Sequence, residues 1–301
     1  MTTEALPVLE TGWGPDTPAD DSLLRRGMLA LAATWEAIGQ TNDGRLHRWD
    51  EGSAVDLGRP TGLFNGATLL QPVSDDAFGR TVGRIERFYD VQGTGATLLW
   101  SPWPTPDLTG RGWVLQGHPP LLYRPPGLPF QPPPPDALTV TEVTTERELA
   151  EWCTVAVDAF PLTEVAAPST LFDRAVLTDE RFRFVVGRDR RRAVAVGCQV
   201  LVDDTNVLLL STVRPEYRGR GYYAALVADR LARAPGLPSV TIVSDDSRPV
   251  LEGRFGFLPV TRCTLWERPR PAPPDVRSPS PHTGPSETTP RPTPRRRGAR
   301  P

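Results

Sequence analysis

A short apolar strand, followed by a basic glycine-rich turn and a helix, constrains the fold of this chain more than any other stretch. Residues 207–213, VLLLSTV, are apolar on both faces, which predicts a central strand covered on both sides. The chain then turns through RPEY and RGRG into a helix expected at about residues 221–234. Because the first turn of a helix has unpaired N–H groups and a partial positive charge, this turn predicts a cradle for a phosphate.

The glycines and arginines of the turn favour the same prediction. Gly219 and Gly221 would let the backbone close around an anion, and Arg218 and Arg220 would add positive charge. The turn matches neither the P-loop pattern nor the dinucleotide-binding GxGxxG pattern. The alternative is a glycine-containing surface turn with solvated arginines.

Hydrophobic periodicity predicts a mixed α/β segment around this unit. The strands are expected at residues 137–143, 182–187, 193–202, 207–213, 239–244 and 260–267. The helices are expected at 145–159, 168–178, 221–234 and 247–254. Thr145 and Glu148 form a predicted capping box at the start of the first of these helices.

The sequence predicts fewer helices and strands in the N-terminal half, which lies between proline-containing segments. Helices are expected at 21–38 and 75–89, and strands at 61–71, 94–100 and 120–123. The segment PPGLPFQPPPP lacks N–H groups that a helix or central strand needs, which indicates a stiff linker. The predicted organisation is a flexible N-terminus (1–20), a first domain (21–124), the linker (125–136), a second domain (137–268) and a disordered Pro/Arg-rich tail (269–301).

Two stretches of the second domain resemble a known family. V-x-P-E-Y-R-G-R-G, from Val213, resembles motif A of the GCN5-related N-acetyltransferases, and LEGRFGFLPV (251–260) resembles the family's closing helix and strand. The resemblance covers about residues 137–267. It implies the α/β (α+β) acetyltransferase fold, in which helices flank a central mixed twisted sheet.

The first domain resembles the N-terminal, partial acetyltransferase domain of two-domain bacterial members of the family. The similar residues are Phe64-Asn65-Gly66 and LLWSPWPTPDL. No Arg-x-x-Gly-x-Gly loop occurs in this half, so we expect a second, smaller domain that does not hold the coenzyme. It would cover the sheet of the second domain or line the acceptor side.

The resemblance implies acetyl-coenzyme A as cosubstrate and no metal. Backbone groups of Thr212 and Val213 would pair with the pantetheine, and the amides of residues 219–223 would meet the pyrophosphate. The implied coenzyme-binding residues are Thr212, Val213, Arg218, Gly219, Arg220, Gly221, Tyr222 and Tyr223. One of them departs from the family pattern, because Tyr223 stands where the family has Gly or Ala.

The catalytic candidates also depart from the family pattern. Glu252 stands in place of the usual Tyr general acid, and it could protonate the leaving thiolate only if burial raised its pKa. Asp245 stands in place of a frequent Asn, and capping of the next helix explains it equally well. The general base stays open among Asp158, Glu164, Ser211 and a water chain.

The function implied by the resemblance is transfer of an acetyl group from coenzyme A to an amine of a small molecule, peptide or protein. The departures motivate an alternative, a non-catalytic acyl-coenzyme A-binding or regulatory protein. The acceptor, the acyl chain length and the choice between monomer and homodimer stay open.

The charge distribution fits an amine acceptor better than a nucleic acid. The total is −2, but residues from Pro269 onward carry seven Arg and two acidic residues, which leaves −7 for the rest. The alternative explanation is that the net negative charge of residues 1–268 serves only to keep the protein soluble. All 34 basic residues are Arg, which either a GC-rich genome or avoidance of self-acylation explains. A third hypothesis is that the basic tail binds nucleic acid or a partner, although it is short and lacks aromatic residues for stacking on bases.

The remaining residue types indicate a cytoplasmic protein without metal. The three isolated cysteines predict buried free thiols in a reducing compartment, and they are Cys153, Cys198 and Cys263. The three histidines have no metal-ligand spacing. A membrane-spanning helix needs about 18 consecutive apolar residues, and no stretch approaches this length. No signal peptide is expected.

Overall fold

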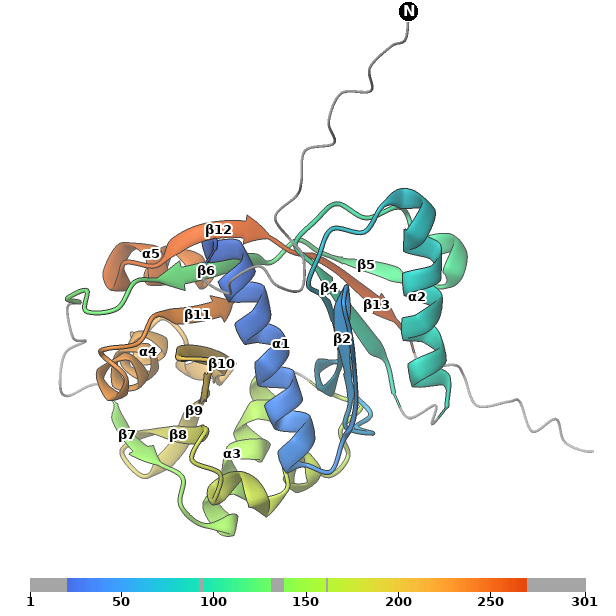
Figure 1. Ribbon diagram of the computed structural model, residues 1–301. Helices are drawn as coiled ribbons and strands as arrows, with labels where there is room; N and C mark the ends of the chain where they lie inside the picture. Colours follow the sequence, from blue (N-terminus) through green and yellow to red (C-terminus); the bar gives the residue numbers. More distant parts are fainter. Residues whose placement is uncertain (1–20, 92–94, 131–137, 161, 270–301) are drawn as a thin grey trace, which may run out of the picture. The chain divides into compact units, whose positions relative to one another are not determined.

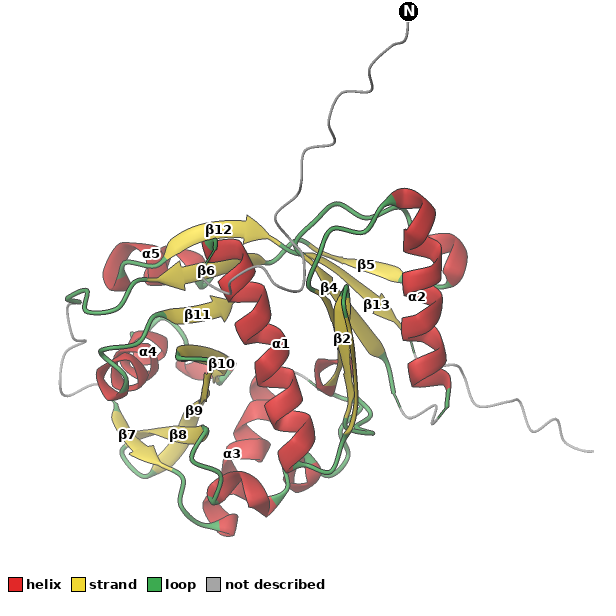
Figure 2. Cartoon of the chain, viewed as in Figure 1, coloured by secondary structure: helices red, strands yellow, loops and turns green. Residues whose placement is uncertain are grey.

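The computed structural model describes residues 21–91, 95–130, 138–160 and 162–269, all within one compact unit. The predictions for residues 1–20, for residues 131–136 of the linker and for the tail from residue 270 concern residues outside these ranges. The predicted α/β class is confirmed, because five α-helices and two mixed sheets make up the described residues (Figures 1 and 2).

The elements have the following bounds. The helices are α1 (Leu23–Thr41), α2 (Asp75–Asp90), α3 (Glu146–Ala159), α4 (Tyr222–Arg233) and α5 (Arg248–Phe255). The first sheet has the order β1 (Arg45–Trp49), β2 (Gly52–Asp56), β3 (Asn65–Leu69), β4 (Thr97–Ser101), β13 (Thr264–Arg268) and β5 (Val114–Gly117). The second has the order β12 (Leu258–Arg262), β6 (Pro120–Arg124), β11 (Ser239–Ile242), β10 (Thr205–Val213), β9 (Arg192–Val202), β8 (Phe182–Asp189) and β7 (Thr139–Glu142).

Each sheet contains one parallel pair joined by a helix. In the first sheet, β3 and β4 are parallel and α2 lies between them in the chain. In the second sheet, β10 and β11 are parallel and α4 connects them. A parallel pair needs such a crossover. The two halves therefore share a β-α-β unit, and only the second unit carries the basic turn.

The two halves exchange a strand. β6 comes from the N-terminal half but pairs with β11 and β12 in the second sheet. β13 comes from the C-terminal half but pairs with β4 and β5 in the first sheet, as the orange-red ribbon of Figure 1 shows. Strand membership therefore does not follow a division of the chain at residue 124. The single strand predicted at 260–267 is two strands that separate at Cys263.

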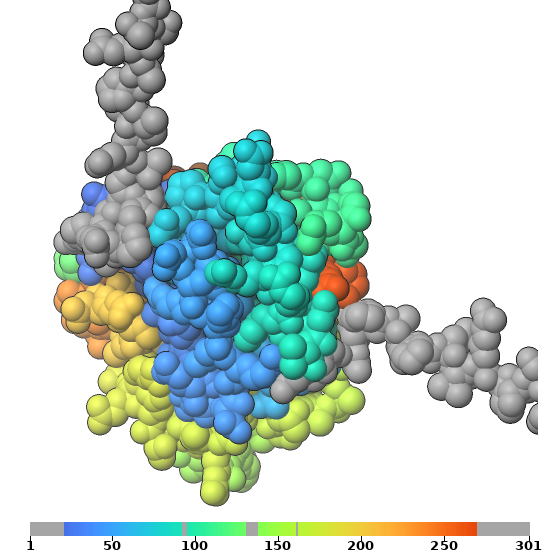
Figure 3. All heavy atoms as spheres, turned by 45° about the vertical axis from the view of Figure 1, so that its right-hand side comes forward, coloured from blue at the N-terminus to red at the C-terminus, as the bar shows by residue number. Residues whose placement is uncertain are grey.

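A helix and a shared core join the two sheets. α1 lies between them in Figure 1, and one cluster of buried apolar side chains includes residues of both halves. Gly27 of α1 packs so close to β6 that a Cβ would lie 3.0 Å from Leu121 Cδ2. In the space-filling view of Figure 3, blue and teal residues of the N-terminal half lie directly against yellow-green residues of the C-terminal half.

Several local predictions were wrong. The helix expected at 168–178 is two short 3-10 turns, Pro168–Thr170 and Arg174–Leu177. Asp173 separates them because its carboxylate caps the Ala175 N–H at 2.9 Å. The sequence also missed β1, β2 and β5, which are short and depend on strand neighbours for their conformation. The capping box of Thr145 and Glu148 is confirmed.

The predicted burial of the three free cysteines is confirmed. Cys153, Cys198 and Cys263 are each no more than 1% exposed. Burial raises the pKa of each thiol to about 12. These side chains therefore stay protonated at neutral pH and contribute to packing.

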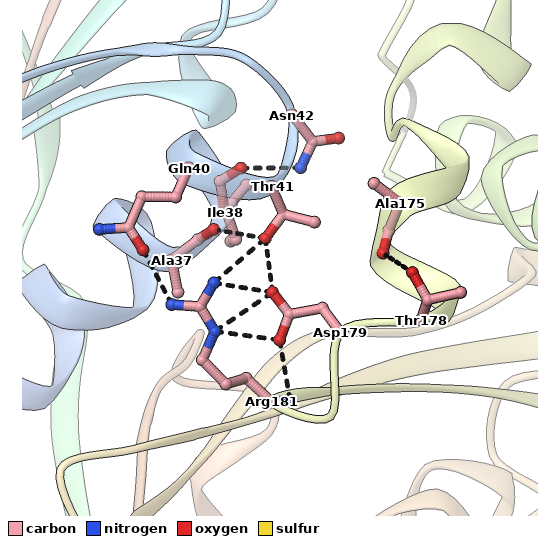
Figure 4. Close-up of polar contacts among 9 residues, drawn as sticks. All are labelled: Ala37, Ile38, Gln40, Thr41, Asn42, Ala175, Thr178, Asp179 and Arg181. Atoms are coloured by element: carbon pink, nitrogen blue, oxygen red, sulfur yellow. Dashed lines mark hydrogen bonds and ion pairs between the residues drawn. The ribbon is translucent and has the colours of Figure 1, made fainter.

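A polar network fastens the end of α1 to the segment before β8 (Figure 4). Asp179 accepts from the Thr41 hydroxyl at 2.7 Å and from Arg181 Nη2 at 2.7 Å. Arg181 also donates to Gln40 Oε1 at 2.9 Å. The hydrogen bonds from Arg181 are the main reason that the pKa of Asp179 is lowered to about 2.

Replacing Asp179 by Asn is expected to lower the free energy of unfolding by about 1 kcal/mol at pH 7, since the network is partly exposed. The carboxylate contributes its stability above its unfolded pKa of about 4, and this contribution is lost as the pH falls toward about 2. Urea unfolding at several pH values measures both effects. Equal pH dependence of the two proteins between pH 5 and pH 2.5 would contradict the account.

Candidate coenzyme and acceptor site

The cleft between β10 and β11 begins where these parallel strands stop pairing. Their ladder ends at the pair Val207 and Val240. Next to it, the Thr241 hydroxyl donates to the Leu208 carbonyl at 2.8 Å, so a side chain takes the place of a backbone donor. The two strands then diverge and leave backbone groups free to meet a ligand.

A β-bulge on the other side of β10 favours this divergence. The register with β9 shifts between Leu209 and Thr212, and Leu210 inside the bulge has a φ of +48°. A left-handed conformation costs a non-glycine residue about 1 kcal/mol, so the surrounding packing must maintain it. Bulges bend the strand that carries them. β10 can thus pair with β9 on both sides of the bulge while leaving β11.

The backbone beyond the bulge distinguishes the two residues expected to pair with pantetheine. The Arg214 N–H donates to the Val194 carbonyl at 2.8 Å. Because hydrogen-bonded positions alternate in an antiparallel pair, the backbone of Thr212 faces β9 and that of Val213 faces away from it. The Val213 carbonyl accepts from Arg218 Nε at 3.1 Å, which leaves its N–H for a ligand.

The basic turn forms an open cavity of about 300 Å³ at the start of α4, here called the cradle. Gly219 and Gly221 have φ angles of +77° and +79°, which glycine adopts without strain. An added Cβ at either glycine would meet no atom within 4 Å. The backbone of the turn is therefore bare and accessible to an anion.

The N-terminus of α4 has unpaired donors. Gly221 is the N-cap residue, no side chain caps the helix, and its first turn contains no acidic residue. The Ala225 N–H is the first amide of the helix that donates to a helix carbonyl, that of Gly221. The amides of residues 222–224 therefore face the cradle without an intrahelical acceptor, which is the arrangement that binds phosphate.

The two arginines of the turn lie differently. Arg218 lines the cradle, and its Nη2 donates to the Ala159 carbonyl at the end of α3 at 3.1 Å. Arg220 does not line the cradle, because it pairs with Asp189 at 3.5 Å. Tyr222 lines the cradle and donates its hydroxyl to Asp189 at 3.0 Å. The structure thus brings Arg218 and Tyr222 to the cavity and directs Arg220 away from it.

The sequence missed one basic residue of the cradle. Arg254, in the last turn of α5, lines the cavity together with Val250. The Arg254 side chain is exposed and has no ion-pair partner among the described residues. Its spacing of four residues from Val250 places both on one helix face. Only the docking of α5 beside α4 reveals that this face meets the cradle.

A second cavity of about 310 Å³, here called the cleft, lies between the diverging strands. Its apolar lining comes from both halves, since Trp100 of β4 and Leu265 of β13 join Leu210 of β10. Its polar lining consists of hydroxyl groups, mainly those of Ser211, Ser244 and Ser247. No charged side chain lines the cleft among the described residues.

The two catalytic candidates do not line either cavity. Glu252 forms an ion pair with Arg248 at 2.5 Å, one turn away on α5. Asp245 is exposed and paired with Arg262 at 2.6 Å, which lowers the pKa of its carboxyl group. In this conformation neither carboxyl group is placed to protonate a thiolate in the cleft.

The three candidates for the general base are also separated. Ser211 lines the cleft, whereas Asp158 pairs with Arg214 at 2.7 Å. Glu164 is exposed, and its charge is felt at Glu267 of β13. Burial, with a smaller contribution from Glu164, raises the pKa of the Glu267 carboxyl. The sequence did not predict that Glu267 lies near Glu164, because this proximity depends on the pairing of β13 with strands of the first sheet.

In the described part of the N-terminal half, the helix equivalent to α4 has no comparable cradle. This helix, α2, follows the N-cap residue Ser74 and has Asp75 and Asp76 in its first turn. These carboxylates already complement the helix dipole and would repel an anion. Asn65 of the Phe64-Asn65-Gly66 stretch instead donates to the carbonyls of Arg59 and Ala96, at 2.8 Å and 3.1 Å. That stretch therefore stabilises the loops around β3.

The buried side chain of Arg230 contacts the backbone at the bulge. Arg230 of α4 is fully buried and donates to the carbonyls of Leu226 and Cys198, each at 2.9 Å. It also reaches the Leu209 carbonyl at the bulge, at 3.4 Å. Gly197 makes room for it, since a Cβ there would lie 2.9 Å from Arg230 Cζ. Arg230 thus links α4, β9 and the start of the cleft.

Within residues 21–91, 95–130, 138–160 and 162–269, no group of three or more His, Cys, Asp or Glu side chains is placed to hold a metal ion. No helix in those ranges has the length and apolar character needed to cross a membrane.

Comparison with solved structures identifies the fold. A GCN5-related N-acetyltransferase from Kribbella flavida is similar with a TM-score of 0.58 and 16% sequence identity, over 81% of this chain and 96% of that one. A functionally unknown conserved protein from Staphylococcus epidermidis is similar with a TM-score of 0.55 and 11% identity, over 76% and 95% of the two chains. A GCN5-related N-acetyltransferase from Sphaerobacter thermophilus has a TM-score of 0.50 and 17% identity, over 74% and 78%.

These similarities confirm the predicted acetyltransferase fold. They extend over more of the chain than residues 137–268 can provide, so they include residues of the N-terminal half. No protein-family model matches the sequence, and comparison with curated proteins gives no match.

Proposed function

We propose, from its GCN5-related N-acetyltransferase fold and its cradle, that this protein transfers an acetyl group from acetyl-coenzyme A to a primary amine. The observation that carries the proposal is the uncapped N-terminus of α4 behind two left-handed glycines. The diphosphate of the coenzyme would accept hydrogen bonds from the amides of residues 222–224. Arg218 and Arg254 would supply positive charge at the same cavity.

The cleft would hold the thioester and the acceptor. The Val213 N–H would bond the pantetheine, and the apolar lining of the cleft would exclude water from the acetyl group. The neutral amine attacks the thioester carbonyl carbon, a C–N bond forms, and the C–S bond then breaks. The amine loses a proton and the departing thiolate gains one. Among the residues that the structure describes, no charged side chain lines the cleft, so positioning of the two reactants would contribute much of the rate.

The proton acceptor would come from residues near the cleft. Ser211 lines it, and a water molecule held by the Ser211, Ser244 and Ser247 hydroxyls could carry the proton outward. We propose that the acceptor is an amine on an apolar small molecule or peptide, which fits the apolar lining.

A second candidate function is binding without transfer. Two observations favour it, namely the ion pairs that keep Glu252 and Asp245 out of the cleft and the bulky Tyr223 at the start of α4. Such a protein would bind acyl-coenzyme A and respond to its concentration. This function requires the same cradle but no acceptor.

Calorimetric titration with acetyl-coenzyme A, followed by thiol release with a panel of amines, tests the proposal. Transfer predicts coenzyme binding together with amine-dependent thiol release and a matching acetylated product. Tight coenzyme binding with no turnover on any amine would support the second candidate. No coenzyme binding by any variant would refute both.

Replacing Arg254 by Ala is expected to weaken acetyl-coenzyme A binding by about tenfold, since one charge-assisted contact to phosphate is lost. The salt dependence of binding should also become shallower, because fewer ions are released. Titrations at two salt concentrations measure both quantities. Arg248→Ala is a matched control on the same helix, because Arg248 does not line the cradle. Equal losses in the two variants would contradict a specific role of Arg254.

A further inference from the structure

Tyr223 occupies a special place between the two cavities. It is the one described residue that lines both the cradle and the cleft. It is the second residue of α4, immediately after the turn that contains Gly221. Tyr223 therefore lies between the two cavities.

Several contacts hold the ring in this position. Tyr223 packs against two separate apolar clusters, one beneath β10 and α5 and the other around Tyr222. Its hydroxyl lies near enough to Ser247, the N-cap residue of α5, for this serine to lower the pKa of the hydroxyl slightly. Burial raises the pKa of the Tyr223 hydroxyl, so it stays protonated at neutral pH. The ring thus closes the space between α4 and α5.

Neither cavity alone is large enough for a coenzyme. The volumes are about 300 Å³ for the cradle and about 310 Å³ for the cleft, at the lower limit of about 300 Å³ for small-molecule pockets. An acyl-coenzyme A has an anionic nucleotide end and a long, uncharged thioester arm. A molecule with its diphosphate in the cradle must extend its arm past Tyr223 to reach the cleft.

We propose that Tyr223 sets the coenzyme affinity of this protein by closing the passage between the cradle and the cleft, an inference that rests on the proposed function. The ring has to leave Ser247 and turn away before the pantetheine arm can pass. Coenzyme affinity is then reduced by the fraction of molecules that have the passage open. A ligand that ends at the diphosphate needs only the cradle and is not affected.

ADP and acetyl-coenzyme A, titrated into the full chain and its Tyr223→Ala variant, test this proposal. The variant is expected to bind acetyl-coenzyme A roughly tenfold or more tightly, because the passage no longer has to be opened. Its affinity for ADP should change by less than about twofold, since the cradle amides are retained. The ratio of the two affinities is therefore the informative quantity, and it is insensitive to the amount of folded protein.

Tyr223→Phe separates the ring from its hydroxyl. It keeps the ring but loses the hydroxyl that interacts with Ser247, so its acetyl-coenzyme A affinity is expected to lie between those of the parent chain and Tyr223→Ala. Weaker coenzyme binding by Tyr223→Ala would overturn the proposal, because Tyr223 would then be a ligand contact. Lost turnover at unchanged coenzyme affinity in Tyr223→Phe would also overturn it and assign the hydroxyl to proton transfer.

The failure of this proposal is distinguishable from failure of the proposed function. Equal acetyl-coenzyme A affinity of the parent chain and Tyr223→Ala would leave the coenzyme site standing and overturn the role of Tyr223 alone. Absence of both ADP and acetyl-coenzyme A binding in all variants would remove the cradle itself. Thermal unfolding of each variant confirms that the comparison concerns folded protein.

Discussion

Replacing Gly221 by Asp is expected to weaken acetyl-coenzyme A binding by about 100-fold or more. The new carboxylate would stand beside the amides of residues 222–224, where the diphosphate binds, and like charges in contact cost several kcal/mol. The fold should tolerate the change, since an added Cβ meets no atom within 4 Å and Asp accepts a left-handed φ better than most residues. Calorimetry at low salt measures the loss.

Gly221→Asn is the matched control for this prediction. Asn has nearly the same size and conformational preference as Asp, but it carries no charge. It should weaken binding less than Asp does, and the difference between the two variants measures the electrostatic contribution. Making both changes in the Tyr223→Ala background keeps the affinities within range. Unchanged coenzyme binding by Gly221→Asp would place the diphosphate elsewhere.

Replacing Arg230 by Ala is expected to lower the free energy of unfolding by about 2–4 kcal/mol. The substitution removes the donor from the Cys198 and Leu209 carbonyls and leaves a cavity between α4 and β9. Removal of a buried charge offsets part of this loss. Because the Leu209 carbonyl lies at the bulge, coenzyme affinity should also fall. Urea unfolding and coenzyme titration measure the two effects.

Arg233→Ala provides a control on the same helix. Arg233 lies one turn further along α4 and pairs with Asp229 at 2.8 Å and with Glu142 at 2.5 Å, and all three side chains are partly exposed. Removing such partly exposed pairs typically costs about 1 kcal/mol or less for each pair, and neither partner of Arg233 belongs to the bulge. Similar destabilisation of the Arg230 and Arg233 variants would contradict the supporting role of the buried guanidinium.

The unit from β10 to α4 was predictable because its signals are local. An apolar run bounded by a Pro turn, two glycines and a periodic helix specify the strand, the turn and the helix without reference to other segments. The bulge was not predictable, because Leu210 adopts a left-handed φ although its residue type gives no sign of it. Arg230 of α4 contacts the neighbouring Leu209 carbonyl at 3.4 Å, and the sequence gives no sign of this long-range contact.

The lining of the cleft could not be predicted because it depends on strand exchange. Trp100 and Leu265 are distant in sequence, and both reach the cleft because β13 pairs with β4. Sequence periodicity identifies a strand but not its partner, since pairing is decided by long-range packing. Glu252 was a reasonable candidate by position. Its partner Arg248 lies four residues away, a spacing that favours the observed ion pair.

A crystal structure of the protein with acetyl-coenzyme A tests the central claim most directly. The account predicts the diphosphate on the amides of residues 222–224, the thioester in the cleft between β10 and β11, and the Tyr223 ring turned away from Ser247. A second structure, of the Tyr223→Ala variant with acetyl-coenzyme A, would show the complex without the aromatic ring. Diphosphate density away from the N-terminus of α4, for example on the exposed arginines Arg190 and Arg191, would contradict the account.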